Sequence, residues 1–241
     1  MESGAPMNYH QLTRREYNSL LAECYSVIYT AQERPWGDSL SWRLESLVPN
    51  PAGKVLDLGC GYGRNFRHIV NAATQVLAID LCPTALHCAE RSYHSAVEQG
   101  KLKVICGDEK KVSGSFDVIV CAGLLVDHLN TRRGQIAEAL ADSLRSGGLL
   151  FVNVFGDNDP ACGRGAEVEE NTYVHELGFP VHYFSEPELL SLFPSLRVVE
   201  VDRTRIPDAY PTPHSHEIVV ALFRQGNTPN KASGTLQGRE Q

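Results

Sequence analysis

The chain has 241 residues, of which 42% are hydrophobic, 21% charged and 8% aromatic, and this is enough for one sizeable domain with its own apolar core. Its 22 lysines and arginines stand against 29 aspartates and glutamates, a net charge of −7 at pH 7. This balance argues against a protein that binds duplex DNA or an anionic membrane, because such proteins usually present a basic face.

The seven cysteines include no C-x-x-C pair, which argues against a zinc ribbon or a thioredoxin motif. Residues Met1–His10 lack the basic and apolar regions of a secretory signal. No apolar run approaches the roughly 20 residues that span a bilayer. We therefore expect a reduced, soluble protein of the cytoplasm.

Apolar residues at three- and four-residue spacings predict a helix over residues 12–31, and a second helix is expected from about 39 to 48. From residue 54 onward, short runs of Val, Ile and Leu alternate with helical stretches. Strands are expected at 54–58, 75–80, 102–106, 116–121 and 149–154, and helices at 64–71, 83–98 and 132–145. Strands that are apolar throughout are typical of a parallel sheet covered on both faces, so a doubly wound α/β sheet is predicted.

The last third of the chain has a different texture. Residues 156–172 are predicted to be irregular, a short helix follows Ser185, and strands are expected at 196–202 and 217–223. Between these strands lie Pro207, Pro211, Pro213, His214 and His216, which indicate a loop long enough to cover a site. Residues 226–241 are polar and are expected to form a disordered tail.

A glycine turn follows the first predicted strand, in the sequence Asp57-Leu58-Gly59-Cys60-Gly61-Tyr62-Gly63. Ligands of open α/β sheets bind at the carboxyl ends of the strands, where this turn belongs. A dinucleotide fingerprint begun at Gly59 would need glycine at position 64, which is Arg64, so a nicotinamide dehydrogenase is disfavoured. The carboxylate of Asp57 would repel a pyrophosphate but suits an ammonium group. The turn therefore predicts an adenosine ligand that has an amino-acid tail and no phosphates.

This turn resembles motif I of the class I S-adenosylmethionine-dependent methyltransferases. Segments 76–80, 106–108, 116–121 and 144–150 resemble later motifs of the same family in the same order, so the likeness covers residues 55–154. More loosely, residues 33–38 and 178–184 resemble the small-molecule and tellurite-resistance-type branch.

The resemblance implies a Rossmann-like, doubly wound α/β fold. Its mostly parallel seven-stranded sheet would have an antiparallel last strand, helices on both faces and an N-terminal helical cap. The expected organisation is a polar N-terminus at 1–11, the cap at 12–50, the methyltransferase domain at 51–225 and the tail at 226–241.

The cofactor implied by the resemblance is S-adenosylmethionine. Asp80 would accept hydrogen bonds from both ribose hydroxyls, and Asp108 would accept one from the adenine amino group. The full set of expected cofactor-binding residues is Asp57, Gly59, Cys60, Gly61, Asn65, Asp80, Leu81, Asp108, Glu109, Cys121 and Trp36.

The function implied is transfer of a methyl group to an O, N or S atom of a small-molecule acceptor by in-line displacement. The alternative is a protein of this fold that binds S-adenosylmethionine without transferring methyl groups, as a cyclase, an assembly partner or a regulatory binder. No Asn-Pro-Pro-Tyr or Asp-Pro-Pro-Tyr follows the fourth strand, which argues against DNA or glutamine methylation. We expect a monomer or homodimer without a nucleic-acid or membrane partner.

His128 and His182 are the main candidate catalytic bases, and Asp127, His214 and His216 are further ones. His128 or His182 would also suit a plain packing role. Because Ser215 separates His214 from His216, these two are expected to point to opposite faces of a strand, and no metal site is expected; a metal pair there is the alternative. Tyrosines at helical spacing (Tyr17, Tyr25 and Tyr29) are interpreted as packing, whereas Trp36 is kept as an aromatic contact for the sulfonium.

Overall fold

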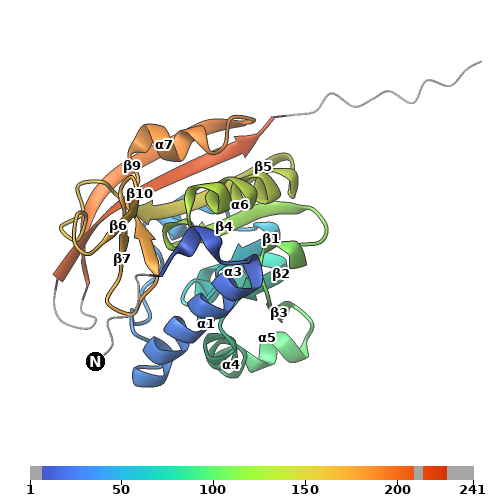
Figure 1. Ribbon diagram of the computed structural model, residues 1–241. Coiled ribbons are helices and arrows are strands. Elements are labelled where there is room, and N and C mark those ends of the chain that lie inside the picture. Colours follow the sequence, from blue (N-terminus) through green and yellow to red (C-terminus); the bar gives the residue numbers. More distant parts are fainter. Residues whose placement is uncertain (1–6, 209–213, 227–241) are drawn as a thin grey trace, which may run out of the picture.

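Residues 7–208 and 214–226 are described by a computed structural model, in which helices cover both faces of a seven-stranded sheet (Figure 1). The strands of this sheet are β1 Gly53–Leu58, β2 Ala73–Asp80, β3 Leu102–Cys106, β4 Phe116–Ala122, β5 Leu144–Phe155, β9 Leu196–Asp208 and β10 His214–Gln225. The helices are α1 Arg14–Ala31, α2 Leu44–Leu47, α3 Phe66–Ala72, α4 Pro83–Ser92, α5 His94–Glu98, α6 Asn130–Asp142 and α7 Glu186–Ser191.

The order of the strands across the sheet is β3-β2-β1-β4-β5-β10-β9. The five neighbouring strands β3, β2, β1, β4 and β5 are parallel, and β10 is antiparallel to both of its neighbours. The chain order reverses between β1 and β4, which is where open α/β sheets form their ligand crevice. The predicted Rossmann-like fold with an antiparallel last strand is confirmed.

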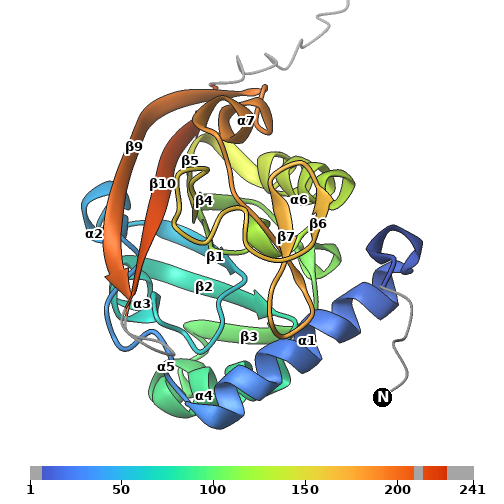
Figure 2. The ribbon, with the colours of Figure 1, turned by 60° about the vertical axis from the view of Figure 1, so that its left-hand side comes forward.

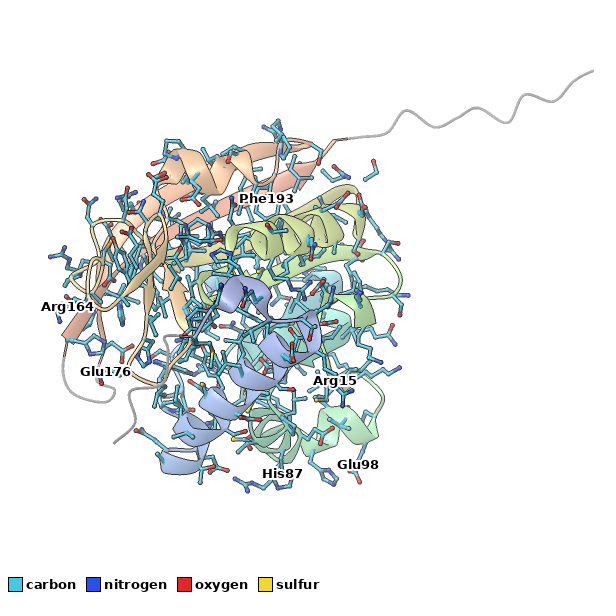
Figure 3. All side chains as sticks on the ribbon, viewed as in Figure 1. Arg15, His87, Glu98, Arg164, Glu176 and Phe193 are labelled. Carbon is cyan, nitrogen blue, oxygen red and sulfur yellow. The ribbon has the colours of Figure 1, made fainter. Side chains whose placement is uncertain are left out.

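Successive residues of each central strand enter different cores. Val55 packs with Phe66 of α3 on one face, whereas Leu56 packs with Ile136 of α6 on the other. Phe193, just after α7, is 1% exposed and belongs to the second core, whereas Glu98 of α5 is exposed (both labelled in Figure 3). Two packed faces explain why the strands are apolar throughout rather than alternating.

The long N-terminal helix α1 begins with a capping box, in which Thr13 and Glu16 exchange side-chain and backbone hydrogen bonds. In Figure 2, α1 runs beside α4. The prediction of a second helix over 39–48 is wrong for most of that range, because only Leu44–Leu47 (α2) is helical there. Arg43 precedes it with a left-handed φ of 64°, which prevents the helix from starting earlier. Among the helices of the described ranges, none has the length and apolarity needed to cross a membrane.

The loop predicted between the last two strands is shorter than expected, since β9 extends to Asp208 and β10 begins at His214. Pro207 lies inside β9, which is the edge strand of the sheet, where a missing amide hydrogen is tolerated. Pro211 and Pro213 lie outside the described residues, as does the predicted tail apart from Gly226.

A second, three-stranded sheet was missed from the sequence. Its strands are β6 Glu167–Glu169, β7 Thr172–Val174 and β8 Pro180–His182, and part of it falls in the segment predicted to be irregular. Strands of three residues are too short to show a hydrophobic period. The helix expected over 83–98 is divided into α4 and α5 at Tyr93.

Candidate functional site

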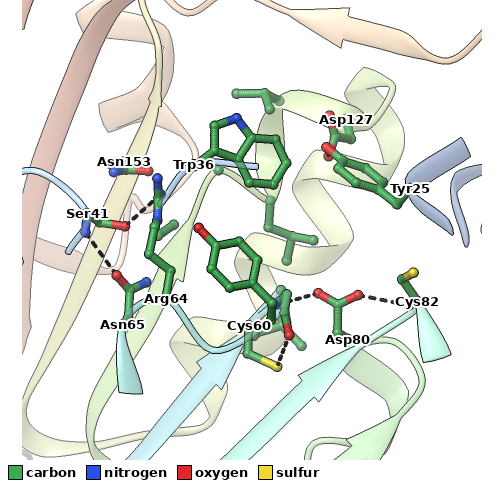
Figure 4. A pocket seen from close by; sticks show the side chains of 18 of the residues that line it. Tyr25, Trp36, Ser41, Cys60, Arg64, Asn65, Asp80, Cys82, Asp127 and Asn153 are labelled. Carbon is green, nitrogen blue, oxygen red and sulfur yellow. Dashed lines mark hydrogen bonds between the residues drawn. The ribbon is translucent and has the colours of Figure 1, made fainter. Parts of the chain in front are cut away.

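A cavity of about 720 Å³ lies at the carboxyl ends of β1, β2 and β4 (Figure 4). Its floor is the glycine turn after β1, and its walls include α1 and the segment between α1 and α2. The ends of β9 and β10 form part of its rim, through Asp208 and His216. The cavity therefore occupies the place that the topology reserves for a ligand.

The glycine turn needs glycine at two positions that line the cavity. Gly59 and Gly61 have φ angles of 76° and 54°, which favour glycine. A Cβ atom on Gly61 would lie 2.8 Å from the hydroxyl oxygen of Tyr29, and one on Gly59 would lie 2.9 Å from the Cβ atom of Leu124. The turn thus brings bare backbone to the cavity floor.

Asp80 ends β2 at the same floor. Its Oδ2 atom accepts a 2.8 Å hydrogen bond from the amide of Gly61, and Oδ1 accepts one of the same length from the amide of Cys82. Burial raises the pKa of this carboxyl, and the backbone hydrogen bonds oppose that rise. A carboxylate has about four acceptor positions, so about two remain for a ligand.

Asp57 is a fully buried carboxyl at the end of β1. Neither of its oxygen atoms has a hydrogen-bond partner within the described residues. Burial, and then the charge of Asp80, raise its pKa to about 8, and Arg64 opposes the rise. Asp57 and Cys121 are both 0% exposed and do not line the cavity, so direct contact with a cofactor is not supported for either. The orphaned oxygens of Asp57 do fit a donor, such as an ammonium group or its water, bound near the turn.

Asp108 and Glu109 follow β3 and form an ionic cluster with α1. Arg14 donates to Oδ2 of Asp108 at 2.7 Å and to Oε1 of Glu109 at 2.5 Å, and Asn18 also donates to Asp108 at 2.7 Å. Burial acts to raise the pKa of Asp108, but the bonds from Arg14 and Asn18 bring it below its usual value. Arg132 binds Glu109 from the other side. Both carboxylates line the cavity, and contacts with α1 hold Asp108 and Glu109 in place. Their expected role in binding the cofactor stays a prediction.

Four aromatic side chains form one wall of the cavity: Tyr25, Tyr29, Trp36 and Tyr62. The ring of Trp36 stacks on Tyr62 with centroids 6.2 Å apart, and Tyr29 meets the edge of Trp36 at 6.0 Å. Trp36 therefore lies where it was expected. Tyr25 and Tyr29 were interpreted as packing residues, because helical spacing alone cannot show that a stripe also faces a cavity.

The segment between α1 and α2 is attached to the glycine turn. Asn65 accepts a 2.9 Å hydrogen bond from the amide of Ser41, and Arg64 donates to the hydroxyl of Ser41 at 3.1 Å. Asn65 was predicted to bind cofactor and does line the cavity. Asn153 lines it as well and was missed, because it lies inside the apolar strand β5.

Asp127 and His128 line the cavity after β4. The pKa values of both side chains depart from those of exposed residues. Burial raises the pKa of Asp127 to about 8, while a 2.6 Å hydrogen bond from Tyr25 opposes the rise. Burial, and then Arg132 and Arg133, lower the pKa of His128 to about 3. His128 is therefore a neutral imidazole and a weak base, and of the two residues Asp127 is the better proton acceptor.

His182 is not brought to the cavity. It is 1% exposed, with Nδ1 2.7 Å from the hydroxyl of Thr172 and Nε2 2.8 Å from Oε1 of Glu188. Both ring nitrogens are occupied, so His182 joins the small sheet to α7, and the catalytic role predicted for it is not supported. The expectation that His214 and His216 point to opposite faces is wrong, since their Nε2 atoms lie 2.8 Å apart.

These features fit the ligand that the sequence predicted. Asp80 offers acceptors for hydroxyl groups, the glycine turn offers bare backbone, Asp57 lacks a donor, and the aromatic wall suits a cation. Residues 55–148 match a family model described as a methyltransferase domain. This segment, which is less than half of the chain, is therefore similar to a methyltransferase domain. The cavity lies at the carboxyl ends of the strands of the matched segment and is closed by segments from outside the matched range.

Several curated relatives of the chain are named as methyltransferases. The chain is 30% identical over 139 residues to a trans-aconitate 2-methyltransferase of Deinococcus radiodurans, covering 56% of this chain and 51% of that protein. It is 32% identical over 144 residues to a ubiquinone biosynthesis O-methyltransferase of Xanthomonas campestris, covering 58% of each. The matches thus span little more than half the length of these relatives.

Solved structures support the fold of the part of the chain that they cover. A Burkholderia thailandensis 1,6-didemethyltoxoflavin-N1-methyltransferase, with that compound and S-adenosylhomocysteine bound, gives a TM-score of 0.67 at 23% identity, covering 92% of this chain and 95% of that one. A methyltransferase from Methanosarcina mazei gives 0.64 at 19% identity, covering 79% and 100%. The narrower likeness to tellurite-resistance methyltransferases stays a prediction.

Proposed function

We propose that this protein transfers a methyl group from S-adenosylmethionine to an O, N or S atom of a small-molecule acceptor. The observation that carries the proposal is Asp80, a half-buried carboxylate at the end of β2 with acceptor positions left at the cavity floor. Relatives named as O-methyltransferases, and a structural neighbour holding S-adenosylhomocysteine beside a small molecule, support it.

When bound, S-adenosylmethionine supplies an electrophilic methyl group on a sulfonium centre. The residues of this chain would then act mainly by position. Asp80 would hold the ribose hydroxyls, and Asp57, which does not line the cavity, would act on the amino group only through an intervening water. Tyr25, Tyr29 and Trp36 would present aromatic faces to the positive charge of the sulfonium. They would also exclude water, so that an acceptor aligned with the methyl group meets no competing nucleophile from solvent.

Proton removal would fall to Asp127 rather than to a histidine. An acceptor that keeps its proton near neutral pH needs a base within reach. In its ionised form, which gains population as the pH approaches its pKa of about 8, Asp127 can take up that proton, whereas His128, with a pKa of about 3, holds one poorly. His128 would remain a neutral hydrogen-bonding side chain at the cavity wall.

We also propose that the protein acts in the cytoplasm on its own or as a homodimer, without nucleic acid. The seven cysteines are all free, which supports a reducing compartment. The net charge of −7 supports the absence of a nucleic-acid partner.

Calorimetry with S-adenosylhomocysteine tests the proposal. Asp80→Asn should weaken binding about 10- to 100-fold, as expected for losing hydrogen bonds to a charged acceptor. Asp142→Asn, an exposed carboxylate at the end of α6, is the matched control and should bind as the unchanged protein does. No binding by the unchanged protein would refute the proposal.

A second experiment addresses transfer itself. The protein and S-adenosylmethionine are incubated with phenols, carboxylic acids, amines and thiols, and mass spectrometry looks for products heavier by one methylene. Such a product supports the proposal. Tight S-adenosylhomocysteine binding with no product from any class would instead favour the binding protein without transferase activity.

A further inference from the structure

Three side chains with metal-binding atoms meet on one face of the hairpin formed by β9 and β10. His214 pairs directly with Asp208 across the two antiparallel strands. His216 lies two residues after His214, and residues two apart in a strand point to the same face. One ligand atom from each of the three lies within 4.8 Å of the others.

The ring of His216 is held in one position and one tautomer. Its Nδ1 atom lies 2.9 Å from Oδ2 of Asp159, a side chain that is 0% exposed. The same oxygen accepts a 2.8 Å hydrogen bond from the amide of Glu217, and the ring stacks on Phe155 at 4.4 Å. Since a carboxylate only accepts, Nδ1 carries the proton and Nε2 presents a lone pair.

This nitrogen lies close to the second histidine. The Nε2 atom of His216 lies 2.8 Å from Nε2 of His214, and the two rings are nearly perpendicular, at 87°. A histidine whose other nitrogen donates to a buried carboxylate is the usual arrangement of a metal ligand, because the carboxylate fixes the ring and makes it more basic. This arrangement distinguishes the cluster from a chance meeting of polar residues.

We propose that Asp208, His214 and His216 bind a first-row divalent transition-metal ion such as Zn²⁺. Two imidazoles and one carboxylate suit Zn²⁺ and its neighbours, whereas Mg²⁺ and Ca²⁺ need a shell of oxygen atoms. Three protein ligands leave at least one coordination position for water or another small ligand.

The site lies at the rim of the cavity, because Asp208 and His216 also line it. A bound ion would join the ends of β9 and β10 there, and its remaining coordination position would be available to an acceptor with an oxygen or nitrogen donor. The ion site stands whether or not the chain transfers methyl groups, since none of its evidence depends on a bound cofactor.

Calorimetric titration of the full chain with ZnCl₂, in the presence of a non-thiol reductant, tests the site. One ion should bind per chain with a dissociation constant in the micromolar range or below, and MgCl₂ should produce no saturable signal. His214→Ala and His216→Ala should each weaken Zn²⁺ binding at least 10-fold. His94→Ala, an exposed histidine on α5, and Cys106→Ser, an exposed thiol, are controls that should leave binding unchanged.

Asp159→Asn tests the positioning of His216 with all three ligands kept. It should lower Zn²⁺ affinity about 10- to 100-fold, the usual effect of losing such a carboxylate. Circular dichroism without metal checks that each variant is folded. If Asp159→Asn is unfolded, His214→Ala still tests the metal site, because His214 is exposed and its replacement should leave the fold intact. The proposal would be overturned if the double variant His214→Ala/His216→Ala bound Zn²⁺ as tightly as the unchanged protein does. Loss of Zn²⁺ binding in Cys106→Ser would overturn it as well.

Discussion

The hydroxyl group of Tyr25 donates a 2.6 Å hydrogen bond to Oδ2 of Asp127 and so joins α1 to the segment after β4, 102 residues further along the chain. Burial, and then the charge of Asp127, raise the pKa of Tyr25 well above its usual value, so its hydroxyl remains a donor. Figure 4 shows the two side chains pointing toward one another at the edge of the cavity. The contact therefore ties the position of the helical cap to the protonation of a cavity carboxyl.

Tyr25→Phe should lower the free energy of unfolding by about 1–2 kcal/mol, because Asp127 loses its buried partner. It should also raise the pKa of Asp127 further, since the hydrogen bond from Tyr25 is the contribution that lowers it. Urea denaturation measures the first effect. Val27→Ala changes a residue of the same helix that is 57% exposed and should stay within about 0.5 kcal/mol of the unchanged protein. Equal stability of the two variants would contradict the prediction.

Arg14→Gln should loosen the other end of α1. Arg14 binds Asp108 and Glu109 through a side chain that is 26% exposed, so we expect the free energy of unfolding to fall by about 1–2 kcal/mol. Because the ionic cluster is partly exposed, salt should reduce the difference. The measurement is urea denaturation of both proteins at low and high salt.

The control for Arg14→Gln is Arg15→Gln. Arg15 is the neighbouring residue on α1, has the same charge and is exposed (Figure 3). It should change stability little at either salt concentration. If the two variants lost the same stability, the effect would come from net charge rather than from the cluster with Asp108 and Glu109.

The parts of the fold that could be predicted are those whose cause is local. The apolar runs that became β1 to β5 need both faces covered, and the glycine turn after Asp57 needs φ angles that few other residues adopt. Asp80 could be placed at the cavity floor because it ends a strand of this kind. Ser185 likewise caps α7 by accepting from the amide of Glu188.

What could not be predicted depends on contacts between distant residues. Arg14 meets Asp108 across 94 positions, and nothing near either residue shows it. The sequence around His182 allowed a catalytic role, and only the fold shows that Thr172 and Glu188 occupy both of its ring nitrogens. His214 and His216 required the register of β10 against β9, since only pairing brings Asp208 beside them.

Asp57 should make the stability of the ligand-free protein fall as pH rises. Its pKa of about 8 lies above the 3.8 of the reference state, so between these values the folded protein holds a proton that the unfolded chain releases. Stability therefore decreases toward pH 8, by at most about 1.4 kcal/mol per pH unit for this group. Asp57→Asn cannot ionise and should lose this contribution.

Thermal unfolding of both proteins from pH 5.5 to 8 measures the effect. The stability of Asp57→Asn relative to the unchanged protein should improve steadily across this range, which separates Asp57 from the histidines that titrate in both. The exposed Asp142→Asn should show a constant difference instead. A constant difference for Asp57→Asn as well would mean that Asp57 is ionised throughout.

Gly61→Ala should affect both folding and the cavity. Its φ of 54° costs an alanine about 1–2 kcal/mol, and the added methyl group would lie 2.8 Å from the hydroxyl oxygen of Tyr29. Gly100→Ala separates these causes, because Gly100 has a φ of 66° with no atom within 4 Å of the new methyl group. Both variants should lose the stability that the positive φ costs an alanine, and Gly61→Ala should lose more in urea because its methyl group meets Tyr29. Only Gly61→Ala should also bind S-adenosylhomocysteine more weakly, by at least about 10-fold, because Gly61 and Tyr29 both line the cavity. Equal affinity in the two variants would show that the turn at Gly61 does not contact the ligand.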